Sequence, residues 1–365
     1  MIEVKLDEAI ILAAEDALRL QRQDGSMPAG HNGPYHDAEL PTRNTAHWLC
    51  IYSYLYETEK SEKWKVAGER ALSYLMGMEC RPYGKAFHCR DKEGKDKCNG
   101  LVGQAWVIEA LVAAGKAFDR KECIDLAEEV FLLHSFDQNV GLWNRVEIDG
   151  ERLSFDPTFN HQLWFAAAGS LLRSSEIQSQ VENFINKVVR NVQLYSNGVI
   201  YHASSMGHLF DYLKKGKIFF INEIILRVKR IFSRRTLYKK SVGYHAFNLY
   251  ALSMLKTKFP RNDVWLSKRI KRALDVNNKK SFVGCLDCTP FSYLYNVSGI
   301  EMAYALEVFL GDEVSASQWL VEQFSRTYSD PAHLLFDGVP DPYTSCARLY
   351  QACRLSGRYE IKLHK

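Results

Sequence analysis

The sequence predicts an all-α protein in which six helical hairpins close into a ring. A helix opening rich in small residues recurs six times, at intervals of about 45 to 60 residues with one wider gap of about 80, which is the scale of a structural repeat. Each opening follows a more polar helix and a long loop of aromatic and polar residues. A single hairpin cannot bury its apolar face alone, so the repeats are expected to pack against one another. The six openings lie at 43–48, 99–106, 160–164, 243–248, 298–301 and 344–348.

Each hairpin is expected to pair a polar outer helix with an inner helix. In the first hairpin, Leu6, Ile10 and Ala14 fall on one face of an outer helix over about 5–23, and Thr42 can cap the inner helix that follows. Inner helices touch neighbours on all sides and should be apolar nearly all round, whereas outer helices should be amphipathic. The later hairpins pair about 61–78 with 100–116, 120–134 with 158–172, 176–194 with 242–256, 262–275 with 297–310, and 312–327 with 342–355.

Two local patterns stand out in the loops. Residues 141–145 alternate like a short strand before Asp149-Gly150, a dipeptide typical of hairpin turns. Asp156 and Asp341 each precede a proline at the start of an inner helix, where the first turn tolerates proline. Because every long loop precedes an inner helix, a closed ring places all of them together at one mouth.

The composition is that of an ordinary globular protein. Of 365 residues, 47% are hydrophobic and 25% are charged, and the repeat indicates one domain over 1–365 with an insertion at 204–240. No uncharged apolar run of about 18 residues exists, so we expect no transmembrane helix, and the N-terminus does not resemble a signal peptide. Nine scattered cysteines, an odd number, are typical of reduced thiols. We therefore expect a cytoplasmic protein.

The insertion is strongly basic. Residues 214–240 contain ten lysines or arginines and one acid, a net charge of +9, whereas the whole chain carries +4, which leaves about −5 for the rest. This segment predicts a basic, apolar helix that packs on the barrel with a solvated face, lies on an anionic membrane surface at the inner face of the membrane, or binds an acidic polymer or a partner protein. A nucleic-acid partner is not expected, because the rest of the chain is acidic and no nucleic-acid-binding motif is present.

The six alternating inner and outer helices, with aromatic loops before each inner helix, resemble the six-hairpin (α/α)6-barrel superfamily. The resemblance covers nearly the whole chain and depends on architecture, with no defining catalytic motif. Members of that superfamily include glycoside hydrolases, unsaturated-uronide hydrolases, sugar epimerases and the helical domains of polysaccharide lyases. The resemblance therefore implies an (α/α)6 toroid with an oligosaccharide or polysaccharide substrate, although a fold does not fix a reaction.

Two carboxylates are the predicted acid/base pair. Glycosidic cleavage needs a proton donor and a second carboxylate, and the loop at 31–44 supplies Asp37. Glu301 lies one turn into an inner helix among tyrosines, where burial would raise its pKa toward the general-acid range. The alternatives are a solvated loop acid or helix cap for Asp37 and a first-turn glutamate favoured by the helix dipole for Glu301.

Histidines are concentrated near the predicted mouth. Eight of eleven fall in loops or in first turns of inner helices. We predict that His161 and His245 orient the substrate or, in an epimerase, serve as base and acid on opposite faces of the sugar ring. The alternative is that loops are polar and histidine is simply one of their polar residues. The eight are His31, His36, His88, His161, His202, His208, His245 and His333.

Other side chains at the mouth are candidates for substrate binding. Arg43, Arg145 and Arg348 could bind a carboxylate bidentately, which would suit a uronic acid, or they could pair with the loop acids instead. Trp143, on a polar loop, is predicted to stack on a sugar face. The further candidates are His36, Glu39, Tyr295 and Asp341.

We expect neither a cofactor nor a metal. Cys285 and Cys288 form a lone C-x2-C pair, which is half a zinc site, and no phosphate-binding or dinucleotide glycine motif is present. The sequence thus predicts a carbohydrate-active enzyme that cleaves or remodels an oligosaccharide or polysaccharide, with uronic acid as a candidate component. The alternatives are a sugar epimerase with paired histidines and a non-catalytic glycan-binding or scaffold component of polysaccharide biosynthesis at the membrane.

Overall fold

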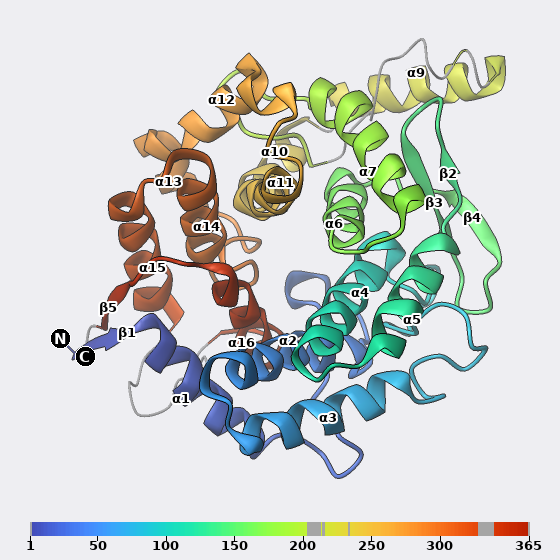
Figure 1. The fold of residues 1–365 in the computed structure, drawn as a ribbon. Helices are drawn as coiled ribbons and strands as arrows, with labels where there is room; N and C mark the ends of the chain where they lie inside the picture. Colours follow the sequence, from blue (N-terminus) through green and yellow to red (C-terminus); the bar gives the residue numbers. More distant parts are fainter. Residues whose placement is uncertain (1, 203–212, 214–215, 233, 328–338, 364–365) are drawn as a thin grey trace.

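Six inner helices form a closed ring in a computed structural model of the chain (Figure 1). The structure describes residues 2–202, 213, 216–232, 234–327 and 339–363. Each inner helix packs against the next around the ring, and the last one returns to the first, so the predicted all-α (α/α)6 toroid is confirmed. The inner helices are α2 (Thr42–Glu59), α4 (Gly100–Ala117), α6 (Phe159–Gly169), α11 (His245–Lys258), α14 (Ser298–Leu310) and α16 (Pro342–Ala347), which continues as a 3-10 helix over Arg348–Arg354.

The outer helices surround this ring and bury one face each. In the outer helix α7, Ile177, Val181 and Phe184 are buried at helical spacing, as expected for a helix that packs through one face. The inner helix α4 is buried continuously over residues 100–112, as expected for a helix that packs on several faces. The outer helices are α1 (Leu6–Leu18), α3 (Glu62–Met76), α5 (Lys121–Leu132), α7 (Ser175–Lys187), α12 (Lys268–Leu274) and α15 (Glu313–Thr327).

Short strands pair the two ends of the chain and form a small sheet before α6. Strand β1 (Ile2–Lys5) pairs antiparallel with β5 (Glu360–Leu363) and joins the two ends of the chain. Before α6, β2 (Phe136–Asp137), β3 (Leu142–Val146) and β4 (Arg152–Phe155) form a three-stranded antiparallel sheet. The predicted strand and turn are therefore present, with Gly150 at a φ of 89°, a conformation that glycine adopts without strain.

The fifth outer segment is broken where a single helix over 262–275 was predicted. The Asn262 side chain accepts a hydrogen bond from the Val264 amide, and the Ser267 side chain accepts one from the Ile270 amide, so two caps start two short helices. The two pieces of this outer segment are the 3-10 helix Asp263–Leu266 and α12. The other short helical elements are the 3-10 segments Gly33–Tyr35, Val189–Asn191 and Asp275–Asn278, and α13 (Lys280–Leu286).

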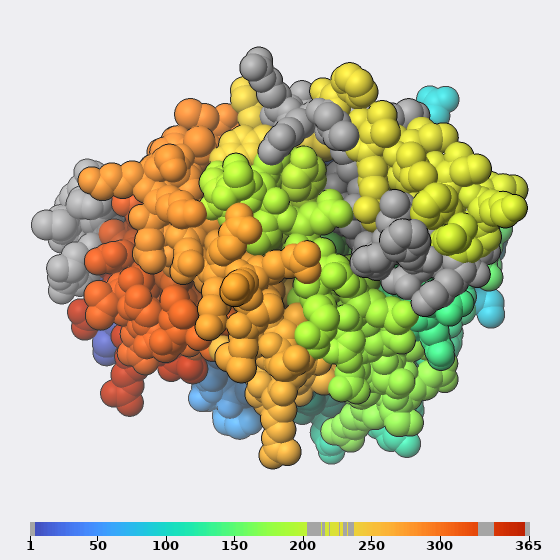
Figure 2. Space-filling model, turned by 90° about the horizontal axis from the view of Figure 1, so that it is seen from above, coloured from blue at the N-terminus to red at the C-terminus, as the bar shows by residue number. Residues whose placement is uncertain are grey.

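The predicted basic insertion contains α9 (Lys217–Phe232) and α10 (Arg234–Gly243). Figure 1 places α9 at the periphery of the ring, and Figure 2 shows it, in yellow, on the outer surface. Parts of the predicted insertion (204–212, 214–215 and 233), as well as His208 and His333, lie outside the described residues. Within the described part of the chain, no helix is both long and apolar enough to cross a membrane.

Candidate active site

A cavity of about 290 Å³ opens where the long loops meet the first turns of the inner helices. This volume approaches the range of small-molecule sites. The lining combines five lysines or arginines with three aspartates, two histidines and several aromatic rings. The lining residues are Asn32, Tyr35, Asp37, Arg90, Lys95, Asp96, Asn99, Gly100, Val102, Trp106, Arg145, Asp156, Pro157, Thr158, Asn160, His161, His202, Lys240, Tyr244, Phe247, Tyr295 and Arg348.

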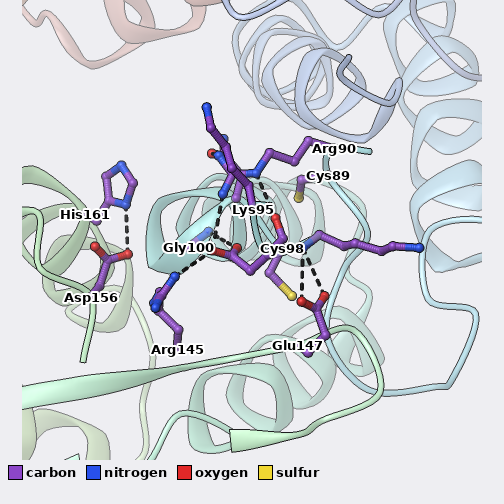
Figure 3. A network of polar contacts seen from close by, with 12 residues as sticks. Cys89, Arg90, Lys95, Cys98, Gly100, Arg145, Glu147, Asp156 and His161 are labelled. Carbon is purple, nitrogen blue, oxygen red and sulfur yellow. Dashed lines mark hydrogen bonds and ion pairs between the residues drawn. The ribbon is translucent and has the colours of Figure 1, made fainter. Parts of the chain in front are cut away.

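Two of the three aspartates hold the loops together. Both carboxylate oxygens of Asp37 accept hydrogen bonds from Lys95 Nζ, at 2.9 and 2.8 Å. Asp96 accepts from Arg90 at 3.2 Å, from Arg145 at 2.9 Å and from the Gly100 amide at 2.6 Å; this network is drawn in Figure 3. Because these bonds are charge-assisted, the two carboxylates are occupied by protein donors rather than offered to a ligand.

The third aspartate orients a histidine. Asp156 is buried, and its Oδ2 lies 2.8 Å from His161 Nδ1 and accepts from the Leu101 amide at 3.1 Å, while Oδ1 accepts from the Thr158 amide at 3.0 Å. Burial by itself would raise the pKa of Asp156, but His161 and these amides outweigh it and hold the pKa below its ordinary value. An ionised Asp156 favours the proton on Nδ1, which leaves Nε2 as an acceptor.

His161 itself is partly exposed and lines the cavity. Figure 3 shows its second ring nitrogen on the side turned away from Asp156. A carboxylate that fixes the imidazole tautomer while the other nitrogen faces a substrate is the arrangement of a general base. The pair can therefore take a proton from a group bound in the cavity.

Two further nitrogen groups face the same cavity. Burial, with smaller effects of Lys240 and His161, lowers the pKa of His202 to about 3, so its ring is neutral at neutral pH. Its Nδ1 has no hydrogen-bond partner among the described residues, and the ring lies 4.5 Å from that of Tyr244. Burial and the nearby Lys95 lower the pKa of Lys240, which brings this ammonium closer to the range of a proton donor at neutral pH.

Arg348 forms a buried cationic part of the wall. Only 1% of the residue is exposed, and neither Nε nor Nη1 has a hydrogen-bond partner within the described parts of the protein. Its guanidinium lies 5.0 Å from the centre of the Tyr295 ring and 5.1 Å from that of Phe247. The Glu301 Oε1 atom lies 3.8 Å from Nη1.

Glu301 is fully buried. Burial raises its pKa to about 8, although Arg348 and Gln351 act in the opposite direction. Because the carboxyl group is then largely protonated at neutral pH, it does not neutralise Arg348, and the guanidinium charge remains available to an anion in the cavity.

The structure brings together only part of the predicted site. Asp37, His161, Arg145, Tyr295 and Arg348 line one cavity. Glu301 does not line it, so the predicted Glu301 and Asp37 pair does not face a shared substrate there.

Four further predicted residues do not line this cavity. Glu39 and Arg43 form a buried ion pair at 3.0 Å, which corresponds to the alternative in which an arginine pairs with a loop acid. Asp341 accepts from the His31, Gly33 and Thr344 amides and so caps α16, while His36 is exposed and stacks on His31.

Two predictions are corrected by burial. The Trp143 ring is fully buried, packs against aromatic core residues such as Phe131, and donates from Nε1 to Gln180 at 2.9 Å. It therefore cannot serve as an open platform for a sugar. His245 is also fully buried, accepts from the Ile200 amide at 3.1 Å and lies 3.0 Å from the Ala273 carbonyl, so it stabilises the fold and does not reach the cavity.

Sequence reasoning missed several lining groups. His202 was among the eight histidines near the mouth but was not selected, and Lys240 was assigned to the insertion. Arg90, Lys95 and Asp96 lie in the run of alternating charge at 90–97 before the second inner helix, and this density of charge in a mouth loop was the available signal.

Comparisons with known proteins place the chain in a family. No protein-family model matches it. Archaeal glycosylation protein Q of Haloferax volcanii is 39% identical over 368 residues, a match that covers 98% of this chain and 99% of that protein. The chain belongs to the family of this glycosylation protein.

Several solved structures have the same fold at much lower sequence identity. Cellobiose 2-epimerase from Bacillus thermoamylovorans matches with a TM-score of 0.61 and 13% identity, over 95% of this chain and 98% of that chain. An inactive variant of an α-1,6-mannanase of Salegentibacter, in complex with α-1,6-mannotriose, matches with a TM-score of 0.56 and 12% identity, over 95% and 98%. At such identities the likeness shows the fold alone, which is the six-hairpin glycosidase-like barrel predicted above.

Proposed function

We propose that this protein is a sugar-modifying enzyme of glycan processing and that the mouth cavity is its active site. The names of its relatives support a carbohydrate substrate, since one is a glycosylation protein and the structural neighbours include a sugar epimerase and a mannanase bound to its oligosaccharide. The observation that carries the proposal is the Asp156 and His161 pair on the cavity wall. A cytoplasmic location stays a prediction.

The reaction that fits this geometry is proton transfer at a sugar carbon. His161 Nε2 removes the proton from a carbon next to a carbonyl or carboxyl group, and the electron pair of the broken C–H bond moves onto that group's oxygen. Arg348 stabilises the developing negative charge. The Lys240 ammonium, in the same cavity, donates a proton to the opposite face of the same carbon. The His161 histidinium then gives its proton to solvent, and the Lys240 amine takes one from solvent. The net result is epimerisation without loss of atoms.

The same wall supports an acidic sugar as substrate. The lining has five cationic side chains against three aspartates, and the aspartates are already bound by protein donors. The Arg348 side chain lines the cavity, and guanidinium groups bind carboxylates well. A uronic acid bound through its carboxylate would offer His161 an acidic C–H bond.

The test is exchange of carbon-bound hydrogen in deuterated water. The full chain is incubated with uronic-acid and neutral oligosaccharides, and deuterium in the recovered sugar is measured by mass spectrometry and NMR. We expect incorporation at one carbon of the acidic sugar and a loss of at least about 100-fold in His161→Gln. His36→Gln is the matched control, because His36 is an exposed mouth histidine outside the cavity lining.

Two outcomes would count against the proposed epimerisation, and the second would also count against an enzyme. Cleavage of the glycan with oxygen from labelled water would indicate a hydrolase instead. Binding of acidic glycans without exchange or cleavage would indicate the non-catalytic scaffold that the sequence left open.

A further inference from the structure

Helix α9 exposes an apolar stripe. Ile218, Ile221, Ile225, Val228 and Phe232 are all exposed, from 45% at Ile225 to 86% at Phe232. Their spacing of three and four residues puts them on one face of the helix. In a helix that packs on a core such a stripe faces inward, so here an apolar surface is presented to the outside.

The other side of α9 is turned toward the protein. Glu223 is 5% exposed and forms an ion pair with Arg227 at 3.0 Å. Glu223 is also the one acid among residues 214–240, which contain ten lysines and arginines. The acidic group of the segment is therefore buried, and the segment as a whole is strongly cationic.

This charge indicates what covers the stripe. Two copies of the chain that met stripe to stripe would bring two cationic segments together, and like charges oppose such contact. An anionic surface would gain both the burial of apolar side chains and the attraction of the basic residues, which is how basic amphipathic helices bind anionic membranes.

The position of α9 relates it to the active-site mouth. The inserted segment begins after His202 and leads to Lys240, and both of these residues line the cavity. Figure 1 and Figure 2 show α9 outside the ring and on the outer surface of the protein. The two ends of the inserted segment therefore lie at the cavity, while α9 itself lies on the outer surface.

We propose that α9 docks this protein in the plane of an anionic lipid bilayer through Ile218, Ile221, Ile225, Val228 and Phe232. The proposal is independent of the reaction proposed above, because it concerns a surface that the cavity does not use.

The test is co-sedimentation of the full chain with vesicles. Phosphatidylcholine vesicles with and without phosphatidylglycerol are compared in low and high salt. The test variant is Ile221→Ser/Ile225→Ser/Val228→Ser, and the matched control is Leu266→Ser/Val314→Ser, which changes exposed apolar residues on other elements. We expect binding to the anionic vesicles that weakens with salt, at least about tenfold weaker binding by the stripe variant, and an unchanged control.

Thermal unfolding of each variant shows that the fold is kept, since all five positions are exposed. Absence of wild-type binding to anionic vesicles, or equal binding by the stripe variant, would overturn the proposal. Self-association that the stripe variant abolishes, without vesicle binding by the wild type, would also overturn it and assign the stripe to a second copy of the chain.

Discussion

Two buried carboxyl groups, Asp156 in the loop before α6 and Glu301 in the first turn of α14, behave in opposite ways. Asp156 has three nearby donors, from His161 and two amides, and its pKa lies below the ordinary value. Glu301 is equally buried, but its nearest cation, Arg348, is 3.8 Å away, and its pKa is raised to about 8. Burial alone therefore does not set the charge of a carboxyl group; the number and closeness of its donors decide.

The two carboxyl groups therefore have different roles in the proposed site. The ionised Asp156 can hold His161 in the tautomer that a base requires, whereas the neutral Glu301 leaves the Arg348 charge available to a substrate anion. The role of Asp156 and the role of Glu301 can each be tested by a separate substitution.

The largest effect is expected for Asp156→Asn. The two carboxylate oxygens accept from His161 and from two backbone amides, whereas a side-chain amide has only one acceptor oxygen and an NH2 group that donates. Donation from this NH2 group to Nδ1 would favour the other tautomer of the imidazole. We expect the rate of hydrogen exchange to fall by about 1,000-fold or more, measured as kcat/KM, while thermal unfolding stays cooperative. A rate within tenfold of wild type would separate His161 from Asp156 in the mechanism.

The pH dependence of the free energy of unfolding should show the raised pKa of Glu301. Folding raises the pKa of Glu301 from 4.5 to about 8, so the folded state keeps a proton that the unfolded state releases. This stabilisation is complete below about pH 4.5 and is lost as the pH rises through 8. Glu301→Gln stays neutral, so between about pH 5 and about pH 8 it should gain roughly 2 to 4 kcal/mol relative to wild type in urea unfolding.

Asp156 should show the opposite trend in the same experiment. Its pKa is lowered on folding, so its contribution is present above about pH 3.8 and is lost as the pH falls further. The stability gap between wild type and Asp156→Asn should therefore narrow in acid. Parallel pH curves for the wild type and both variants would contradict the contrast between the two carboxyl groups.

A smaller effect is expected for Arg348→Met. Removal of this guanidinium should weaken the binding of an acidic sugar by about 10- to 100-fold, the value of a charge-assisted hydrogen-bond pair, and leave a neutral sugar unaffected. Calorimetric titration with both sugars measures the difference, and Arg348→Lys should be intermediate because it keeps the charge without the fork. Equal losses of affinity for the acidic and the neutral sugar would mean that Arg348 has a structural role instead.

The smallest effect is expected for Trp143→Phe. The variant loses the hydrogen bond to Gln180 and some buried volume, at a cost of about 1 to 2 kcal/mol in unfolding free energy. Glycan affinity should not change, because the ring does not line the cavity. A clear loss of glycan affinity would mean that Trp143 does contribute to substrate binding.

The comparison also shows how far sequence reasoning reached. The hairpins could be predicted because alternating outer and inner helices differ in how many faces they bury, and the mouth followed from the loops before each inner helix. The buried state of Glu301 could be predicted from its tyrosine neighbours, but its contact with Arg348 could not, because that contact joins α14 to the 3-10 helix that continues α16.

The errors have a common cause. Trp143 lies in a mouth loop and His245 opens an inner helix, yet each hydrogen-bonds to a residue far away in the sequence, Gln180 and Ala273 respectively. A side chain that buries itself against a remote element gives no local signal of doing so.

The most direct test of the proposed base is the tautomer of the His161 ring, measured by ¹⁵N NMR of the histidine side chains at neutral pH with His161→Gln for assignment. We expect a proton on Nδ1 and none on Nε2 in the wild type, and loss of this pattern in Asp156→Asn. A proton on Nε2 in the wild type, or the same tautomer in both proteins, would contradict the claim that Asp156 makes His161 the base of this site.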